Sequence, residues 1–253
     1  MKVIAHHLFA KALMAVNLSC MVGWVGMPVQ AQPTRPSASG MDRTEVTVGA
    51  VARFAQATGF VSQAEKRGWS LTYEGGWAQR PGWSWAKPYG QSAAPDEPAV
   101  HLNFDEAQAY CRWAGQRLPT EREWRQWAYT EMRIQPIAPF VTSKTYAYPT
   151  GDTPQGAHCL GDCGSRTPGV AHAQTSRGVG HTRVGTSTAG VNGLWDMGGN
   201  VWEWAQGDNP NAQEQPTLGG SWWYGAAQMH RDHSATKPRD LSVVYVGFRC
   251  YTP

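Results

Sequence analysis

Helical periodicity is clearest in two segments of the chain. The segment EVTVGAVARFAQATGF predicts a helix with Thr47 as its N-cap and Gly59 at its end. One face of this helix would be formed by Val51, Phe54, Ala55 and Thr58. The segment NFDEAQAYCRWAG predicts a second helix, from near Asp105 to Gly115.

A third helix is predicted in the segment LPTEREWRQWAY. Thr120 and Glu123 have the spacing of a capping box, in which each side chain accepts a hydrogen bond from the other residue's backbone. Trp124 and Trp127 are three residues apart and therefore fall on one face, which we expect to point inward.

The rest of the chain shows little period. Residues 68–98 alternate tryptophan, glycine, proline and tyrosine, and predict an irregular loop packed by Trp69, Trp77, Trp83 and Trp85. Residues 131–190 predict loops with short strands. LGGSWWYG and VVYVGFRCY are the strand candidates, because they are rich in aromatic and β-branched residues. Helices come first and strands late, without an internal repeat, so we predict an α+β fold.

The amino-terminal segment is typical of a secretory signal peptide. Lysines precede an apolar stretch from about Ala12 to Val25, and Val29 and Ala31 suit a small-residue cleavage site. We therefore expect residues 1–31 to be a signal peptide and 32–40 a Pro/Ser linker before a domain over 41–253. The expected location is periplasmic or secreted. The alternatives are a membrane anchor, which the short and polar-interrupted stretch disfavours, and a lipoprotein cut before Cys20.

Charge and cysteine content narrow the class of protein. Removal of the signal peptide leaves basic and acidic residues nearly balanced, which gives no reason to expect nucleic acid or an anionic membrane as partner. Four cysteines remain, and an even number in an exported chain suggests two disulfides among three possible pairings. A local Cys159–Cys163 bridge would leave Cys111 to pair with Cys250; the alternative for CLGDC is half of a metal site, for which no second cysteine pair exists.

Five motifs in a fixed order resemble the formylglycine-generating enzyme, or sulfatase-modifying factor, family. They are EVTVGAVARFAQATG, VHLNFDEAQAYCRWAGQRLPTEREW, GLWDMGGNVWEW, LGGSWW and VGFRC, and the resemblance covers about residues 41–253. It implies a C-type-lectin-like fold with few helices, small sheets and much irregular loop. The family's usual first strand, with a GGxFxMG pattern, is not found here, so we expect an edge strand to be missing.

The resemblance breaks down at the family's reactive residues. The enzymes oxidise a substrate cysteine with two copper-binding cysteines, which lie three and eight residues beyond the serine of the GGS motif. Counted from Ser221, these positions are Tyr224 and Met229, and neither supplies a thiolate for Cu(I). We expect no copper and no copper-dependent oxidase activity. A further disulfide of some members is also absent, since its positions hold Ala128 and Ser234.

The motif DMGGNVWEW matches a calcium-binding segment of the family. The resemblance implies Asp196 and Glu203 as side-chain ligands, and Gly199 and Val201 as ligands through their backbone carbonyls. The residue types agree, because calcium prefers oxygen ligands and glycines allow the chain to coil tightly around an ion. A second calcium site of the family has an asparagine where this chain has His158.

The same region suggests a ligand-binding groove. Its candidate residues are Ser221, Trp222, Tyr224, Trp202, His230 and His233. We predict a calcium-stabilised protein without the family's oxidase activity that binds a protein or peptide partner. One alternative is an oxidative enzyme of the non-haem iron or siderophore-maturation type, with iron near His230, Asp232 and His233. Another is an inhibitor or accessory module for a neighbouring secreted enzyme.

Overall fold

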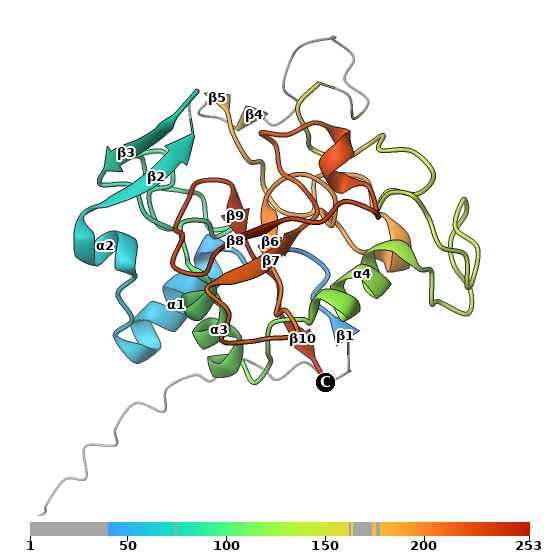
Figure 1. Cartoon of the computed structure of the whole chain (residues 1–253), viewed down its shortest axis with the longest axis horizontal. Helices are drawn as coiled ribbons and strands as arrows, with labels where there is room; N and C mark the ends of the chain where they lie inside the picture. Colours follow the sequence, from blue (N-terminus) through green and yellow to red (C-terminus); the bar gives the residue numbers. More distant parts are fainter. Residues whose placement is uncertain (1–39, 74, 162, 164–173, 176–177) are drawn as a thin grey trace, which may run out of the picture. The chain divides into compact units, whose positions relative to one another are not determined.

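The computed structural model describes residues 40–253, except 74, 162, 164–173 and 176–177 (Figure 1). The predicted signal peptide and all but the last residue of the predicted linker lie outside the described residues. None of the described helices has the length and apolar character needed to span a bilayer.

The three predicted helices are confirmed. Helix α1 (Val48–Thr58) begins after Thr47, whose hydroxyl accepts a hydrogen bond from the Ala50 N–H, and it ends at Gly59 with φ 71°. Helix α3 (Phe104–Trp113) has Asn103 as its N-cap. Helix α4 (Glu121–Tyr129) has the predicted Thr120–Glu123 capping box; Trp124 is fully buried, whereas Trp127 is only partly buried.

One helix and two strands lie between residues 60 and 98, and both strands fall within the segment 68–98 that was predicted to be an irregular loop. Helix α2 (Gln63–Arg67) has a capping box formed by Ser62 and Glu65. Strands β2 (Trp69–Tyr73) and β3 (Trp77–Pro81) form an antiparallel hairpin. The prediction of an irregular loop over 68–98 was therefore wrong in its first half, because its glycines and prolines stand at the turn and at the end of a regular hairpin. Trp77 is also 59% exposed and does not pack the segment.

A four-stranded sheet positions the candidate site. Its strand order is β8 (Thr236–Pro238), β7 (Glu214–Leu218), β6 (Trp202–Trp204) and β9 (Val246–Gly247), and only the β6–β9 pair is parallel. The predicted strand LGGSWWYG is mostly wrong, since β7 ends at Leu218. Gly219 and Gly220 have φ values of 89° and 71°, and a Cβ on Gly219 would lie 2.6 Å from the Met197 carbonyl oxygen. The chain therefore turns at these glycines and continues without regular strand structure.

The remaining elements are short. They are β1 (Gly40–Met41), β4 (Gln174–Thr175), β5 (Gly178–Val179), β10 (Tyr251–Thr252) and the 3₁₀ turns η1 (Val191–Gly193) and η2 (Ala226–Met229). Strand β1 pairs antiparallel with β10. The expectation of a missing edge strand was therefore wrong, although the strand that forms is only two residues long. The α+β class is confirmed.

Strand β6 separates two parts of the core. Trp202 and Trp204 lie in the largest hydrophobic cluster, with α1 and α3, whereas Glu203 contacts Trp124 of the second cluster. Successive side chains of a strand point to opposite faces. Trp202 and Trp204 therefore pack on one side of β6, and Glu203 lies on the other.

Two disulfides tie this fold, with the predicted pairing. Cys111 joins Cys250 with 5.6 Å between the Cα atoms, and Cys159 joins Cys163. Each cysteine of the described residues is thus oxidised in a disulfide.

Candidate functional site

The segment after β7 carries Tyr224 and Met229, the two positions that the resemblance matches to the family's copper-binding cysteines. The Tyr224 N–H donates to the Ser221 carbonyl oxygen, and the Tyr224 carbonyl oxygen accepts a hydrogen bond from the Leu160 N–H, 2.9 Å away in the Cys159–Cys163 loop. Met229 is 1% exposed and packs beside that disulfide, and its carbonyl oxygen accepts a hydrogen bond from the Tyr129 hydroxyl. The Tyr224 side chain is partly exposed, whereas the Met229 thioether is buried in the core.

Tyr224 belongs to a group of side chains around Trp202. We call Trp202, Tyr224, His233, Lys237 and Tyr245 the aromatic cluster. The Trp202 ring centroid lies 5.5 Å from that of Tyr224 and 5.8 Å from that of His233, and the Lys237 Nζ lies 4.1 Å from the Trp202 centroid. Tyr224 and Tyr245 meet edge to face at 5.8 Å. Side chains from four segments between residues 202 and 245 thus meet at one place.

Burial and neighbouring charged or phenolic groups shift the pKa values of three residues in the aromatic cluster. Burial lowers the pKa of Lys237 to about 8. Burial also lowers the pKa of His233, and the cations Lys237 and Arg125 lower it further. Burial raises the pKa of Tyr245 above its ordinary value, and the neighbouring Tyr224 phenol adds to this. The aromatic cluster thus combines aromatic rings with one ammonium group, that of Lys237.

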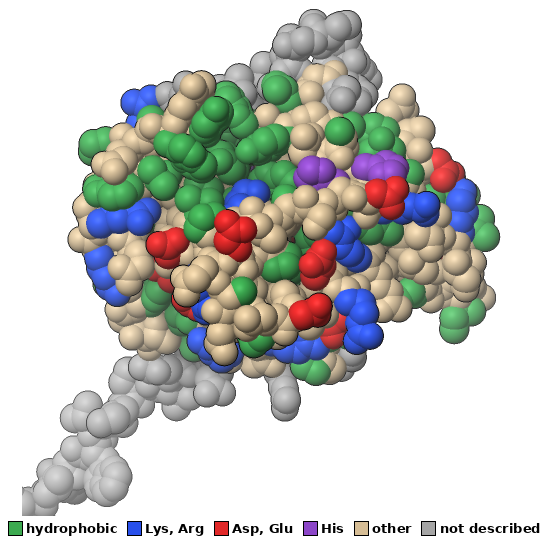
Figure 2. Space-filling view, in the orientation of Figure 1, with side chains coloured by type: hydrophobic (Ala, Val, Ile, Leu, Met, Phe, Trp, Pro, Cys, Tyr) green, Lys and Arg blue, Asp and Glu red, His purple; other side chains and the backbone are tan. Residues whose placement is uncertain are grey.

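The predicted groove residues divide between the core and the surface. Ser221, Trp202 and Trp222 are buried, with exposed fractions of 0, 2 and 5%. Tyr224, His230 and His233 are partly exposed. Figure 2 shows hydrophobic side chains gathered over the β2–β3 hairpin and extending toward the middle of this face, with histidines beside them. The accessible part of the predicted groove is therefore its tyrosine and histidine rim.

The histidines of MHRDH do not converge. The His230 ring packs edge to face on Tyr148 with the centroids 5.3 Å apart, whereas His233 packs on Trp202. The His230 Nδ1 is 3.5 Å from an Asp232 carboxylate oxygen. Within the described ranges, no three histidine, cysteine or acidic side chains come close enough to hold a metal by themselves. The iron alternative gains no support from this arrangement.

A second group of polar residues is buried on the other face of β6. Glu203 and Arg249 are both fully buried and form two parallel hydrogen bonds of 2.7 Å, and the Trp124 Nε1–H donates a third to Glu203. Arg249 also donates to the carbonyl oxygens of Asp42 and Trp195. Burial opposes the charge of Arg249, but Glu203 outweighs it and raises the pKa of the guanidinium.

Two further carboxylates lie in this group and are only partly paired. Asp196 Oδ2 accepts a hydrogen bond from the Gly185 N–H, and Glu45 Oε1 accepts one from the Asn200 side chain. Asp196 Oδ1 and Glu45 Oε2 are buried without a hydrogen-bond partner. Burial raises the pKa of Glu45 well above its ordinary value, and the Asp196 carboxylate raises it further. We call Glu45, Asp196, Glu203 and Arg249 the acidic cluster.

The acidic cluster fits a calcium ion in part. Three carboxylates face one guanidinium, and two oxygens lack partners, which is the imbalance that a divalent cation compensates. Asp196 presents an unpaired oxygen, as the resemblance implies. Glu203 Oε2 already accepts two hydrogen bonds, whereas Oε1 accepts one and keeps a lone pair for an ion.

The backbone between Asp196 and Val201 coils tightly, as expected for a loop that turns carbonyls inward. Asp196, Gly199 and Asn200 have φ values of 59°, 81° and 52°. A Cβ on Gly199 would lie 2.3 Å from the His158 carbonyl oxygen, so only glycine fits there. Because no three side chains suffice, a calcium ion here would need backbone oxygens such as those of Gly199 and Val201.

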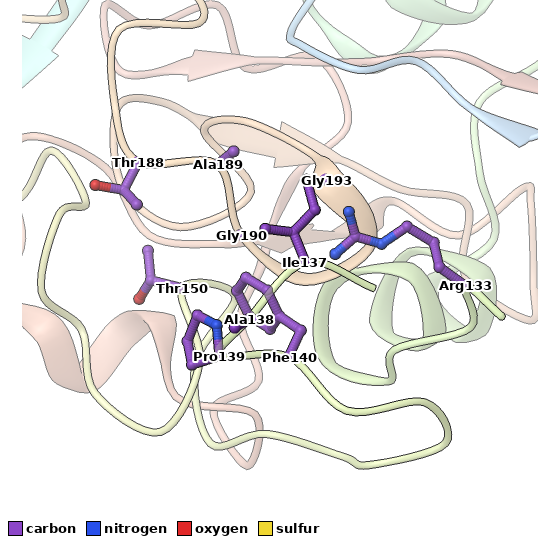
Figure 3. A pocket seen from close by; sticks show the side chains of 10 residues that line it. All are labelled: Arg133, Ile137, Ala138, Pro139, Phe140, Thr150, Thr188, Ala189, Gly190 and Gly193. Atoms are coloured by element: carbon purple, nitrogen blue, oxygen red, sulfur yellow. The ribbon is translucent and has the colours of Figure 1, made fainter. Parts of the chain in front are cut away.

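A separate pocket of about 240 Å³ lies between the 133–140 segment and η1 (Figure 3). Its charged residue is Arg133, which pairs with the buried Glu131 at 2.8 Å and lies over Phe140. The other residues that line it are apolar or small. The Glu131 carboxylate therefore neutralises the charge of Arg133. None of the residues that line the pocket belongs to the aromatic or the acidic cluster.

Sequence reasoning missed Lys237, Glu45 and Arg249. Lys237 reaches Trp202 through the pairing of β8 with β7, in which Lys237 lies opposite Gln215. Nothing near Lys237 in the sequence signals that register. Arg249 did carry a signal, because it interrupts the apolar run VVYVGFRCY, where a charged side chain needs a buried partner. Glu45 follows Arg43 and Thr44 and carried no such signal.

Comparison with known proteins identifies the family of the chain. The family described as "Sulfatase-modifying factor enzyme 1-like domain" matches residues 29–252. The formylglycine-generating enzyme of Thermomonospora curvata is 29% identical, over 83% of this chain and 80% of its own. The inactive C-alpha-formylglycine-generating enzyme 2 of Mus musculus is 27% identical, over 78% of this chain and 69% of its own.

Solved structures give the fold. PvdO from Pseudomonas aeruginosa has a TM-score of 0.56 and 16% identity, and the match covers 84% of this chain and 80% of PvdO. This identity is low, so the likeness concerns the fold alone. The profile match over nearly the whole described chain shows that the protein belongs to the formylglycine-generating enzyme, or sulfatase-modifying factor, family.

Proposed function

We propose that this chain is an exported member of the family that binds a segment of a protein partner through the aromatic cluster. In this proposal it does not carry out copper-dependent cysteine oxidation. Tyr224 and His233 form the accessible rim, the buried Trp202 supports them, and Lys237 supplies charge. The signal peptide predicted over residues 1–31 supports export.

One observation carries the proposal: the two positions that hold reactive thiols in the enzymes hold a surface tyrosine and a buried methionine. Every cysteine of the described residues is in a disulfide, so none of them is free to ligate copper as a thiolate. An aromatic surface with a tyrosine at its rim is a typical element of a binding hot spot. Loss of the metal ligands with retention of the surface favours recognition over catalysis.

A partner-capture experiment tests this function. We expect the full chain, immobilised in the presence of calcium, to retain one stoichiometric protein from the periplasmic or secreted fraction. The Tyr224→Ala variant should bind that protein at least tenfold more weakly, because it removes the rim of the aromatic cluster. Mass spectrometry identifies the partner, and calorimetry with the purified partner measures the affinity.

The matched control is Ile134→Ala, which removes a side chain that is 90% exposed and lies outside the aromatic cluster. This variant should bind the partner like the wild type. Unchanged binding by Tyr224→Ala would place the interface elsewhere, and equal loss in both variants would show that the effect is not specific to the aromatic cluster. Formation of formylglycine on a sulfatase-type cysteine peptide, with copper supplied, would contradict the proposal directly.

We further propose that calcium binds at the acidic cluster, held by Asp196, Glu203 and the backbone carbonyls of Gly199 and Val201. The unpaired oxygens of Asp196 and Glu45 support this, because buried unpaired carboxylate oxygens destabilise a fold and a bound cation would satisfy them. The ion would act by stabilising the fold, and Glu45 would add a third carboxylate close to it.

Calcium should therefore raise the stability of the protein. At a calcium concentration one hundred times its Kd, the free energy of unfolding should exceed that in EGTA by about 2.7 kcal/mol. Asp196→Asn should lose most of this increment, whereas Asp152→Asn, at a surface carboxylate paired with Lys144, should keep it. Calorimetric unfolding with and without calcium measures the increment, and identical curves for the wild type would rule out the site.

A further inference from the structure

Lys237 occupies an unusual position for a lysine. It lies on the edge strand β8, but its side chain runs back across the sheet to Trp202. The Nζ donates a hydrogen bond of 2.8 Å to the Thr217 hydroxyl. An ammonium group has three donors, so this contact leaves two N–H groups directed elsewhere.

The charge of Lys237 has no carboxylate partner among the residues that the structure describes. Burial alone accounts for the fall of its pKa to about 8, without an opposing charge. Several other cations of the described residues have a carboxylate partner: Lys144 pairs with Asp152, Arg117 with Glu123, and Arg239 with Asp105. A half-buried ammonium is stabilised when an anion approaches it. The nearby Arg125 is already paired with Glu121 at 2.8 Å, so it leaves Lys237 as the unpaired charge of the aromatic cluster.

The surface leading away from Lys237 is apolar. Tyr224 and Tyr245 continue from Trp202, and the Tyr73 phenol is close enough to Tyr245 to raise its pKa. Tyr73 is 40% exposed and packs edge to face with the exposed Trp77 of the same hairpin. A ligand with one anionic group at Lys237 would therefore meet aromatic rings next to it.

We propose that the partner segment carries a carboxylate that pairs with the Lys237 ammonium, beside an aromatic or aliphatic group that packs against Tyr224. This inference rests on the proposed function and names the chemistry of its ligand. A single ammonium next to a ring suits a carboxylate of one negative charge. A phosphate, by contrast, is typically held by several arginine forks or backbone N–H groups. The carboxylate belongs to an acidic side chain or a carboxyl terminus of the partner.

A titration with a small probe tests the pairing without knowledge of the partner. The full chain is labelled with ¹³C and ¹⁵N at lysine, and the Lys237 side-chain resonance is assigned from its loss in Lys237→Gln. Phenylacetate should shift this resonance and raise the pKa of Lys237 toward that of an ordinary lysine. The neutral isostere phenylacetamide should bind at least tenfold more weakly, and the resonances of Lys66 and Lys144 should stay in place.

Two variants complete the test. Lys237→Gln should lose phenylacetate binding, and Lys237→Arg, which keeps the charge, should recover part of it. Equal binding of phenylacetate and phenylacetamide would overturn the inference. So would unchanged phenylacetate binding by Lys237→Gln, no shift at 50 mM phenylacetate, or tenfold tighter binding of phenyl phosphate.

Failure of this inference can be told apart from failure of the proposed function. If the captured partner is lost by Tyr224→Ala but retained by Lys237→Gln, the binding function stands and the carboxylate pairing is wrong. If phenylacetate binds through Lys237 but no partner is captured, the pairing stands and the partner-binding function is wrong.

Discussion

Replacing Arg249 with methionine should lower the free energy of unfolding by about 3–5 kcal/mol. Arg249 and Glu203 are fully buried and joined by two hydrogen bonds, and Asp196 and Glu45 lie in the same cluster. Removal of the guanidinium leaves three buried carboxylates without a cation. Urea denaturation in EGTA measures the change without a contribution from bound metal.

The chain offers a matched control in a second pair of the same geometry. Arg117 and Glu123 also form two hydrogen bonds of 2.7 Å, but the Arg117 side chain is 37% exposed. Arg117→Met should therefore lower the stability by about 1 kcal/mol or less. Arg249→Lys should fall between the two, because lysine keeps the charge but loses the fork that binds Glu203 and two carbonyls. Similar losses for Arg249→Met and Arg117→Met would show that burial does not decide the effect.

Removing the Cys111–Cys250 disulfide should also cause a large fall in the free energy of unfolding. This bond joins residues 139 apart in sequence, and loop-closure entropy gives a loss of about 5 kcal/mol when both cysteines become alanine. It ties helix α3 to the carboxyl-terminal segment, next to Arg249. The variant should be largely unfolded at 37 °C, as circular dichroism would show.

The second disulfide serves as the comparison. Cys159 and Cys163 are four residues apart, and the same relation gives a loss of only about 2 kcal/mol for their replacement by alanine. All four cysteines are buried, so the two double variants remove similar side-chain packing and differ mainly in loop length. An equal or larger loss from the local pair would contradict the entropic explanation.

Local signals in the sequence gave the helices and the disulfides correctly. Thr120 and Glu123 alone predict where α4 begins, because a capping box is a contact between residues three positions apart. The CLGDC spacing similarly indicated its own bridge and left only one partner for Cys111. The order of helices and strands gave the α+β class, and the resemblance gave the family. The assignment of Tyr224 and Met229 to the positions of the family's thiols stays a prediction.

Strand pairing, and contacts between residues distant in the chain, could not be predicted from these local signals. The β2–β3 hairpin was hidden by its glycines and prolines, and GGSWW looked like a strand because its aromatics outweighed two glycines with positive φ. Lys237 gained its place beside Trp202 only from the register of β8 on β7. The acidic cluster joins Glu45, Asp196, Glu203 and Arg249, which are far apart in the chain, so spacing could suggest only the Asp196–Glu203 part.

The position of strand β6 between the two clusters has a thermodynamic consequence. Trp202 belongs to the aromatic cluster and its neighbour Glu203 to the acidic cluster, so one peptide unit connects the two sites. If both sites bind as proposed, a displacement of β6 by one ligand changes the affinity for the other ligand. Linkage then requires reciprocity: the factor by which calcium changes the affinity for the partner equals the factor by which the partner changes the affinity for calcium. Capture of the partner would then depend on the surrounding calcium concentration.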